Sequence, residues 1–189
     1  MKSSSSGIPN RQKAALLGII GGIAGVLAMQ WFQRHWLPVL FPEFQQAPQG
    51  NAMTIADPVE ALAVIPSASQ PGEHAAQTLA RLVYEKLTPA PAATPQRRAA
   101  FDSAMEWVIG ISAGIGYGGT RTTTRWRDIA GAFFMGIRMW IGEIMGTPVF
   151  GLRLGPTRYS PKQLLALQIR YWSFTFVMTT VTRILYRLF

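Results

Sequence analysis

The stretch AALLGIIGGIAGVLAMQWF, Ala14–Phe32, contains nineteen residues and no charged side chain. At a rise of about 1.5 Å per residue, a helix of this length crosses about 30 Å, the thickness of the hydrocarbon core of a bilayer. The segment therefore predicts a membrane-spanning helix, which we assign to residues 14–33. Because Lys2, Arg11 and Lys13 precede it, a cleaved secretory signal is the competing interpretation. We expect a retained helix.

Three further apolar blocks follow along the chain, and each contains few charged residues. Recurring blocks of about twenty apolar residues are typical of a protein that crosses the membrane several times. The sequence therefore predicts an all-α fold, an integral membrane bundle of four transmembrane helices. The three later spans are assigned to residues 99–119, 129–147 and 164–186.

A long loop, residues 34–98, separates the first two spans. Its prolines divide it into pieces too short for a separate domain. Within it, the stretch EHAAQTLARLVYEKL, residues 73–87, places apolar side chains at helical spacing. This pattern predicts an amphipathic helix on the membrane surface or on the bundle. The stretch PVEALAVI, residues 58–65, favours one or two further helical turns.

The chain is basic, with 18 lysines and arginines against 9 acidic residues and a net charge of +9. The basic residues gather in the connections between apolar blocks, where such residues commonly flank membrane ends. This position indicates contact with lipid head groups and argues against a nucleic-acid-binding face. Three basic residues precede the first span and one, Arg34, follows it, so the positive-inside rule favours cytoplasmic N- and C-termini, with residues 1–13 as a cytoplasmic tail.

Glycines recur at close spacing along three of the predicted spans. On a helix such residues form a row, and a glycine row lets two backbones approach closely, which supplies much of the contact energy between helices in lipid. The pattern predicts helix-packing surfaces whose partner is a helix of this chain or of another. The predicted packing residues are Gly18, Gly21, Gly22, Gly25, Gly110, Gly114, Gly118, Gly142 and Gly146.

Four charged residues lie away from the ends of the predicted spans: Glu106, Arg138, Glu143 and Arg170. A charge in hydrocarbon costs about 2.5 to 3.5 kcal/mol on insertion scales, so it normally faces an opposite charge or water. Counting along the helices places Glu106, Glu143 and Arg170 at a similar depth. We expect Glu106 to pair with Arg170, and Glu143 to pair with Arg170 or Arg138. This intramembrane charge network either fixes helix register or forms a proton or solute pathway.

Three segments and a polar turn carry a resemblance to a known family. They are GIIGGIAGVLAMQWF, AMEWVIGISAGIGYGG, WIGEIMGTPVFGL and the turn with Tyr159 and Pro161. Together they resemble the YagU-like family of bacterial inner-membrane proteins, a domain of unknown function. The resemblance implies a small integral protein of the inner, cytoplasmic membrane and no established reaction. Family members often have histidines where this chain has Glu106 and Arg170, so no role that depends on imidazoles is expected.

An enzymatic role is not expected. The two histidines, His35 and His74, lack the spacing of paired metal ligands. The glycine cluster at residues 114–119 matches a dinucleotide-binding fingerprint only weakly, because it follows no strand and lies in a predicted span. We therefore expect no catalytic residue, no metal site and no cofactor.

The expected function is that of a non-catalytic accessory or scaffold subunit, which docks to a larger membrane complex through its glycine-lined helices. Its expected partners are the lipid bilayer and other membrane subunits or further copies of itself, and not nucleic acid. The alternative is a small channel or carrier for protons or a small solute, which would use the intramembrane glutamates and arginines.

Overall fold

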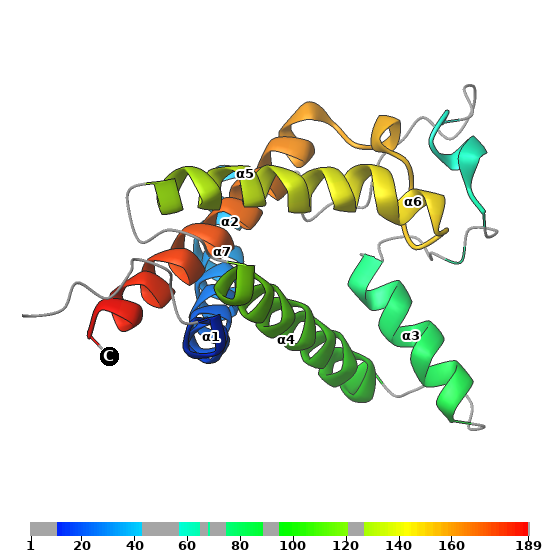
Figure 1. Ribbon diagram of the computed structural model, residues 1–189. Coiled ribbons are helices and arrows are strands. Elements are labelled where there is room, and N and C mark those ends of the chain that lie inside the picture. Colours follow the sequence, from blue (N-terminus) through cyan, green and yellow to red (C-terminus); the bar gives the residue numbers. More distant parts are fainter. Residues whose placement is uncertain are drawn as a thin grey trace, which may run out of the picture.

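The computed structural model describes residues 11–42, 57–64, 68, 75–88, 95–120 and 127–188 (Figure 1). In these ranges the chain is helical and contains no strand. The expected tail lies mostly outside them, except that its last residues, from Arg11, already belong to the first helix. The elements are α1 (Arg11–His35), α2 (Leu37–Leu40), η2 (Glu60–Leu62), α3 (Ala75–Leu87), α4 (Pro95–Thr120), α5 (Arg127–Ile141), η3 (Gly142–Gly146), α6 (Thr147–Val149), η4 (Pro156–Arg158) and α7 (Pro161–Leu188).

Each of the four predicted spans lies inside a long helical segment. They correspond to α1, to α4, to the continuous run α5–η3–α6, and to α7. Two helices, Arg11–His35 and Asp128–Val149, are long and apolar enough to cross a membrane by length and composition. The structure thus shows an all-helical protein with two candidate membrane spans.

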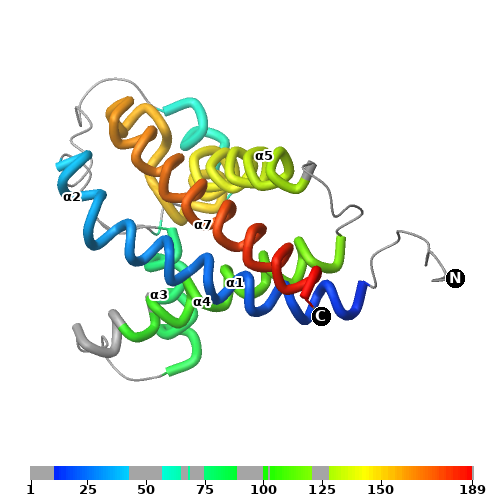
Figure 2. The backbone as a smooth tube through the Cα atoms, turned by 90° about the vertical axis from the view of Figure 1, so that its left-hand side faces the viewer, coloured from blue at the N-terminus to red at the C-terminus, as the bar shows by residue number. Residues whose placement is uncertain are grey.

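Helix α1 occupies the middle of the bundle. It packs against α4 on one side and α7 on the other, and α5 packs on α7. Figure 2 shows α1 and α7 running obliquely side by side, with α4 behind α1. A buried apolar cluster of Val26, Met29, Phe174 and Met178 lies between these helices. The bundle is therefore built outward from α1 and α7.

One glycine row of α1 forms the contact with α4. A Cβ at Gly22 would lie 2.6 Å from the carbonyl oxygen of Gly110, and one at Gly18 would lie 2.9 Å from the carbonyl carbon of Gly114. A Cβ at Gly118 would lie 2.7 Å from the Ala14 carbonyl carbon. Real Cβ atoms do not approach backbone so closely, so these positions require glycine. The predicted packing role of this row is confirmed.

The second glycine row of α1 faces α7. A Cβ at Gly21 would lie 2.7 Å from the Met178 carbonyl oxygen, and one at Gly25 would lie 2.9 Å from that of Phe174. The packing role is confirmed here too. The partners, which the sequence left open, are helices of the same chain.

The prediction for Gly142 and Gly146 is not met within the part of the chain that the structure describes. A Cβ at either position would meet nothing within 4 Å. Both residues belong to η3, a π-helical turn, whose wider winding changes the face that each residue presents. Spacing of four residues makes a row only on a regular α-helix, so the spacing argument fails at this turn.

Helix α3 corresponds to the amphipathic helix that the sequence predicts, and it lies on the bundle. It packs against α4 and buries Ala75, Thr78, Ala80 and Tyr84. The Tyr84 ring meets that of Phe101 edge to face, with centroids 5.1 Å apart. Residues 73 and 74, the first two of the predicted helix, lie outside the described residues.

Candidate functional site

A cavity of about 570 Å³ opens between α4 and the α5–η3 segment. Helices α1 and α7 contribute further walls, and the first turns of α3 border it. Three of the four predicted network residues line it, namely Glu106, Glu143 and Arg170. The prediction that these three lie at a similar depth agrees with their position around one cavity.

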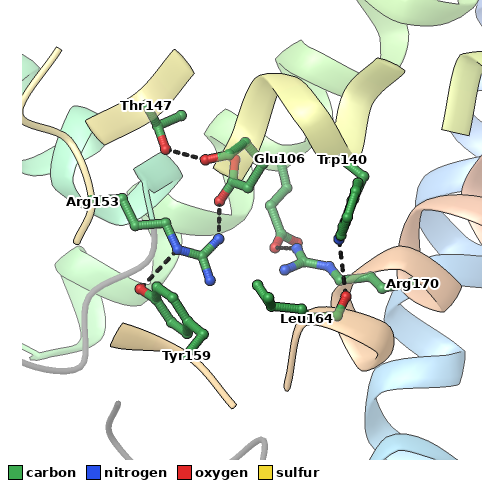
Figure 3. A network of polar contacts seen from close by, with 8 residues as sticks. Glu106, Trp140, Thr147, Arg153, Tyr159, Leu164 and Arg170 are labelled. Atoms are coloured by element: carbon green, nitrogen blue, oxygen red, sulfur yellow. Dashed lines mark hydrogen bonds and ion pairs between the residues drawn. The ribbon is translucent and has the colours of Figure 1, made fainter. Parts of the chain in front are cut away.

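The Glu106–Arg170 pair joins α4 to α7. The Arg170 guanidinium donates to a Glu106 carboxylate oxygen at 2.8 Å, as Figure 3 shows. Two glutamines of α1 complete the group. The Gln30 amide donates to the other Glu106 oxygen at 3.4 Å, and Gln33, with its amide oxygen turned toward the guanidinium, accepts from Arg170 at 3.0 Å. The predicted pairing of Glu106 with Arg170 is confirmed.

The prediction for Glu143 is wrong. Its carboxylate pairs with Arg153, 2.6 Å away, and not with Arg138 or Arg170. Arg153 is only 4% exposed and also donates to the Tyr159 hydroxyl at 2.9 Å (Figure 3). Arg153 comes from the connection after α6, which folds back beside η3. Because this cation lies outside the predicted spans, a comparison of charges within spans did not include it.

Burial and pairing act in opposite directions on Arg153. Burial lowers the pKa of its guanidinium, but the Glu143 carboxylate and the Tyr159 hydroxyl outweigh burial, and the pKa is raised. Arg153 is therefore a fixed positive charge. It neutralises Glu143 at the edge of the cavity, where the Tyr171 hydroxyl also hydrogen-bonds the Glu143 carboxylate.

Arg138, the fourth predicted network residue, is separate from the cavity. It is exposed on α5, and within the described ranges no acidic side chain forms an ion pair with it. Residue 138 lies near the middle of the candidate span Asp128–Val149. The single predicted network therefore divides into a cavity group, with Arg153 added, and one outward-facing cation.

A second polar cluster, which sequence reasoning missed, fastens the long loop to the connection before α7. Asp57 is fully buried and accepts from the Thr157 backbone at 2.9 Å and from the Val59 backbone at 2.8 Å. Glu60 accepts from the Gly155 backbone at 2.7 Å. Burial raises the pKa of Asp57, but its hydrogen bonds from Thr157, Val59 and Glu60 outweigh burial and lower that pKa. The sequence feature that could have indicated this cluster is the Asp57–Pro58 step at the start of the predicted helical turns, residues 58–65.

Among the residues that the structure describes, no three His, Cys, Asp or Glu side chains converge on one point. His35 is exposed, and its ring bonds the Trp31 carbonyl oxygen. His74 lies outside the described residues. The cavity group consists of paired charges and amides, which suits binding through hydrogen bonds.

Comparisons with protein-family models, with curated proteins and with solved structures found no match for this chain. The class of the protein therefore rests on its own fold and site. It is an all-helical protein with two candidate membrane spans and a cavity between helices that is lined by both apolar and polar side chains.

Proposed function

We propose that the chain is a four-span protein of the bacterial inner membrane, with both termini in the cytoplasm, and that it is a non-catalytic accessory subunit. It docks to another membrane protein through the outer face of α5. The resemblance to YagU-like proteins agrees with this proposal, but brings no reaction with it.

Pairing of charges supports α4 and α7 as spans. Each contains a charged residue in its apolar part, and an unpaired charge there is costly. In the structure the Glu106 carboxylate of α4 contacts the Arg170 guanidinium of α7 at 2.8 Å. The two helices therefore present a neutral pair rather than two isolated charges.

The observation that carries the docking proposal is the outward-facing Arg138. The glycine faces of α1 and α4 are filled by helices of the same chain, so they are not the docking surface that the sequence suggested. On α5, Phe134 and Ile141 are exposed on the same face as Arg138. An arginine at mid-span costs about 2.5 to 3.5 kcal/mol unless it meets an opposite charge or water. A partner helix with a carboxylate at that depth would supply the charge.

Single cysteines test the number of spans, because the native chain has no cysteine. If all four helices cross, a cysteine at Thr124 reacts with a membrane-impermeant maleimide from the same side as one at Ser3, and a cysteine at Thr157 reacts from the opposite side. If only α1 and α5 cross, both results are reversed. Labelling of intact and opened spheroplasts separates the two topologies.

Purification from native membranes in a mild detergent tests the docking. We expect the wild type to retain a stoichiometric membrane protein that carries an acidic residue in a span, and Arg138→Leu to lose it. Arg138→Lys retains the charge and should retain the partner. Arg11→Leu, the same replacement at an exposed arginine outside the apolar part of α1, is the matched control. A wild type that migrates alone contradicts the accessory role.

The cavity favours a second candidate, a small carrier. Its paired Glu106 and Arg170 resemble the intramembrane charges of proton and solute pathways. Proteoliposomes that contain the purified chain would then show a solute or proton flux, and Glu106→Gln would abolish it. The accessory role predicts no flux in either protein.

A further inference from the structure

The cavity is partly open and has the size of a ligand-binding site. Pockets for small ligands measure about 300 to 1,000 Å³. This cavity measures about 570 Å³. Its volume lies in the range of a binding site, and α4 and α5 are held apart around it by their separate contacts with α1 and α7.

The cavity lining has an apolar part and a polar part. Apolar walls come from Val26, Ile109, Met139 and Phe174, while the α1 glutamines and the Glu106–Arg170 pair supply hydrogen-bonding groups. A lining of this kind fits an amphipathic molecule, whose apolar part contacts the walls and whose polar part meets the amides and charges.

The charges around the cavity select the sign of the polar part. Glu106 is neutralised by Arg170, and Glu143 by Arg153. Arg34 also lines the cavity, is exposed, and forms no ion pair among the residues that the structure describes. Because Arg153 neutralises Glu143 from outside the lining, Arg34 is, among the described lining residues, the one positive charge beyond the two neutral pairs. Arg34 immediately follows the first predicted span, at the depth where lipid head groups lie.

We propose that the cavity binds one anionic lipid, with an acyl chain between α4 and α5 and the charged head group at Arg34. The shared chemistry is a carboxylate or phosphate joined to an acyl chain, which a fatty acid and an anionic phospholipid both provide. The proposal requires neither docking through Arg138 nor transport, so their failure leaves it standing.

Thermal stability of the detergent-purified protein measures this binding. Oleate, phosphatidylglycerol and phosphatidylcholine with oleoyl chains are added separately over the same concentration range. We expect the unfolding midpoint to rise with oleate or phosphatidylglycerol, and the more effective of the two identifies the source of the anion. Equal rises with all three lipids, or no rise with either anion, overturn the proposal.

Two variants locate the site. Gly142 lines the cavity, a Cβ there meets nothing within 4 Å, and its φ is not positive, so Gly142→Leu fills space without forcing the fold. Gly131→Leu is the matched control, since Gly131 is equally open on α5 but lies outside the cavity. We expect Gly142→Leu to abolish the lipid-dependent shift and Gly131→Leu to keep it.

Removal of the head-group contact is the second test. Arg34→Gln should weaken binding of the anion roughly tenfold, the effect of losing one charge-assisted hydrogen bond. It should leave the response to phosphatidylcholine unchanged, and Arg11→Gln should behave like the wild type. A Gly142→Leu or Arg34→Gln protein that keeps the full anionic shift overturns the assignment of the lipid to this cavity.

Discussion

At Gly114 the backbones of α1 and α4 meet without side chains between them. A Cβ at Gly114 would overlap the Gly18 carbonyl oxygen and lie 2.9 Å from the Gly22 Cα. Both obstacles are backbone atoms, which cannot rotate away as a side chain would. Gly114→Ala therefore moves α1 and α4 apart along their whole seam.

The expected loss follows from this geometry. Overpacking of a closed interior typically costs about 1 to 3 kcal/mol. A separation of 0.5 to 1 Å also removes about a quarter to a half of each dispersion contact across the seam. Because the obstacle is backbone, we expect the upper end of the range, a loss of about 3 kcal/mol in the free energy of unfolding.

The matched control lies on the same helix. A Cβ at Gly116 would meet nothing within 4 Å, so Gly116→Ala introduces the same methyl group without a clash. Alanine exceeds glycine in helix propensity by up to about 1 kcal/mol in water, so this variant should be unchanged or more stable. Tryptophan fluorescence during titration of mixed micelles with a denaturing detergent measures both. If Gly114→Ala is as stable as Gly116→Ala, the described α1–α4 contact is wrong.

Three further predictions concern the polar groups. Arg170→Leu should destabilise the fold by about 3 to 5 kcal/mol because it leaves a carboxylate unpaired, and adding Glu106→Leu should restore part of the loss; strictly additive unfolding free energies would contradict the pair. The pKa of Asp57 is lowered, so its ionised carboxylate contributes fully to the stability of the fold above the ordinary pKa of about 3.9, and this contribution disappears as the pH falls through the lowered pKa. Asp57→Asn should therefore flatten the acid side of a plot of unfolding midpoint against pH, and an unchanged slope would exclude this role. The φ of Gly155, −65°, suits any residue, but a Cβ there would meet the Asp57 carboxylate. Gly155→Ala should therefore lower the unfolding midpoint, and Asp57→Gly added to it should recover part of the loss. A wild-type midpoint for Gly155→Ala would count against the contact.

Local patterns predicted most of the helices and one of the ion pairs. Apolar blocks mark helices well because burial and helix formation involve the same continuous segments. Glu106 and Arg170 were paired by counting from helix ends, which works because both helices are regular between those ends and the paired residues. The same count placed Glu143 at the right cavity, but not opposite the right partner.

The errors come from irregular backbone and from contacts distant in sequence. The π-helical turn at Gly142–Gly146 shifts the face of each residue, and no spacing rule for an α-helix accounts for it. Arg153 reaches Glu143 because a connection folds back, and Asp57 reaches Thr157 across a hundred positions in the sequence. Such contacts depend on the whole fold, so an analysis of one sequence segment at a time does not predict them.

The double role of α1 has a consequence for biosynthesis. Its two glycine rows are covered by α4, which begins at residue 95, and by α7, which begins at residue 161. A ribosome that adds about 5 to 20 residues per second needs several seconds to make the intervening segment. Until α7 is made, α4 is the only one of these two helices that α1 can pack against, and the row with Gly21 and Gly25 awaits its helix. Insertion factors or surrounding lipid must cover that row until synthesis of α7 closes it.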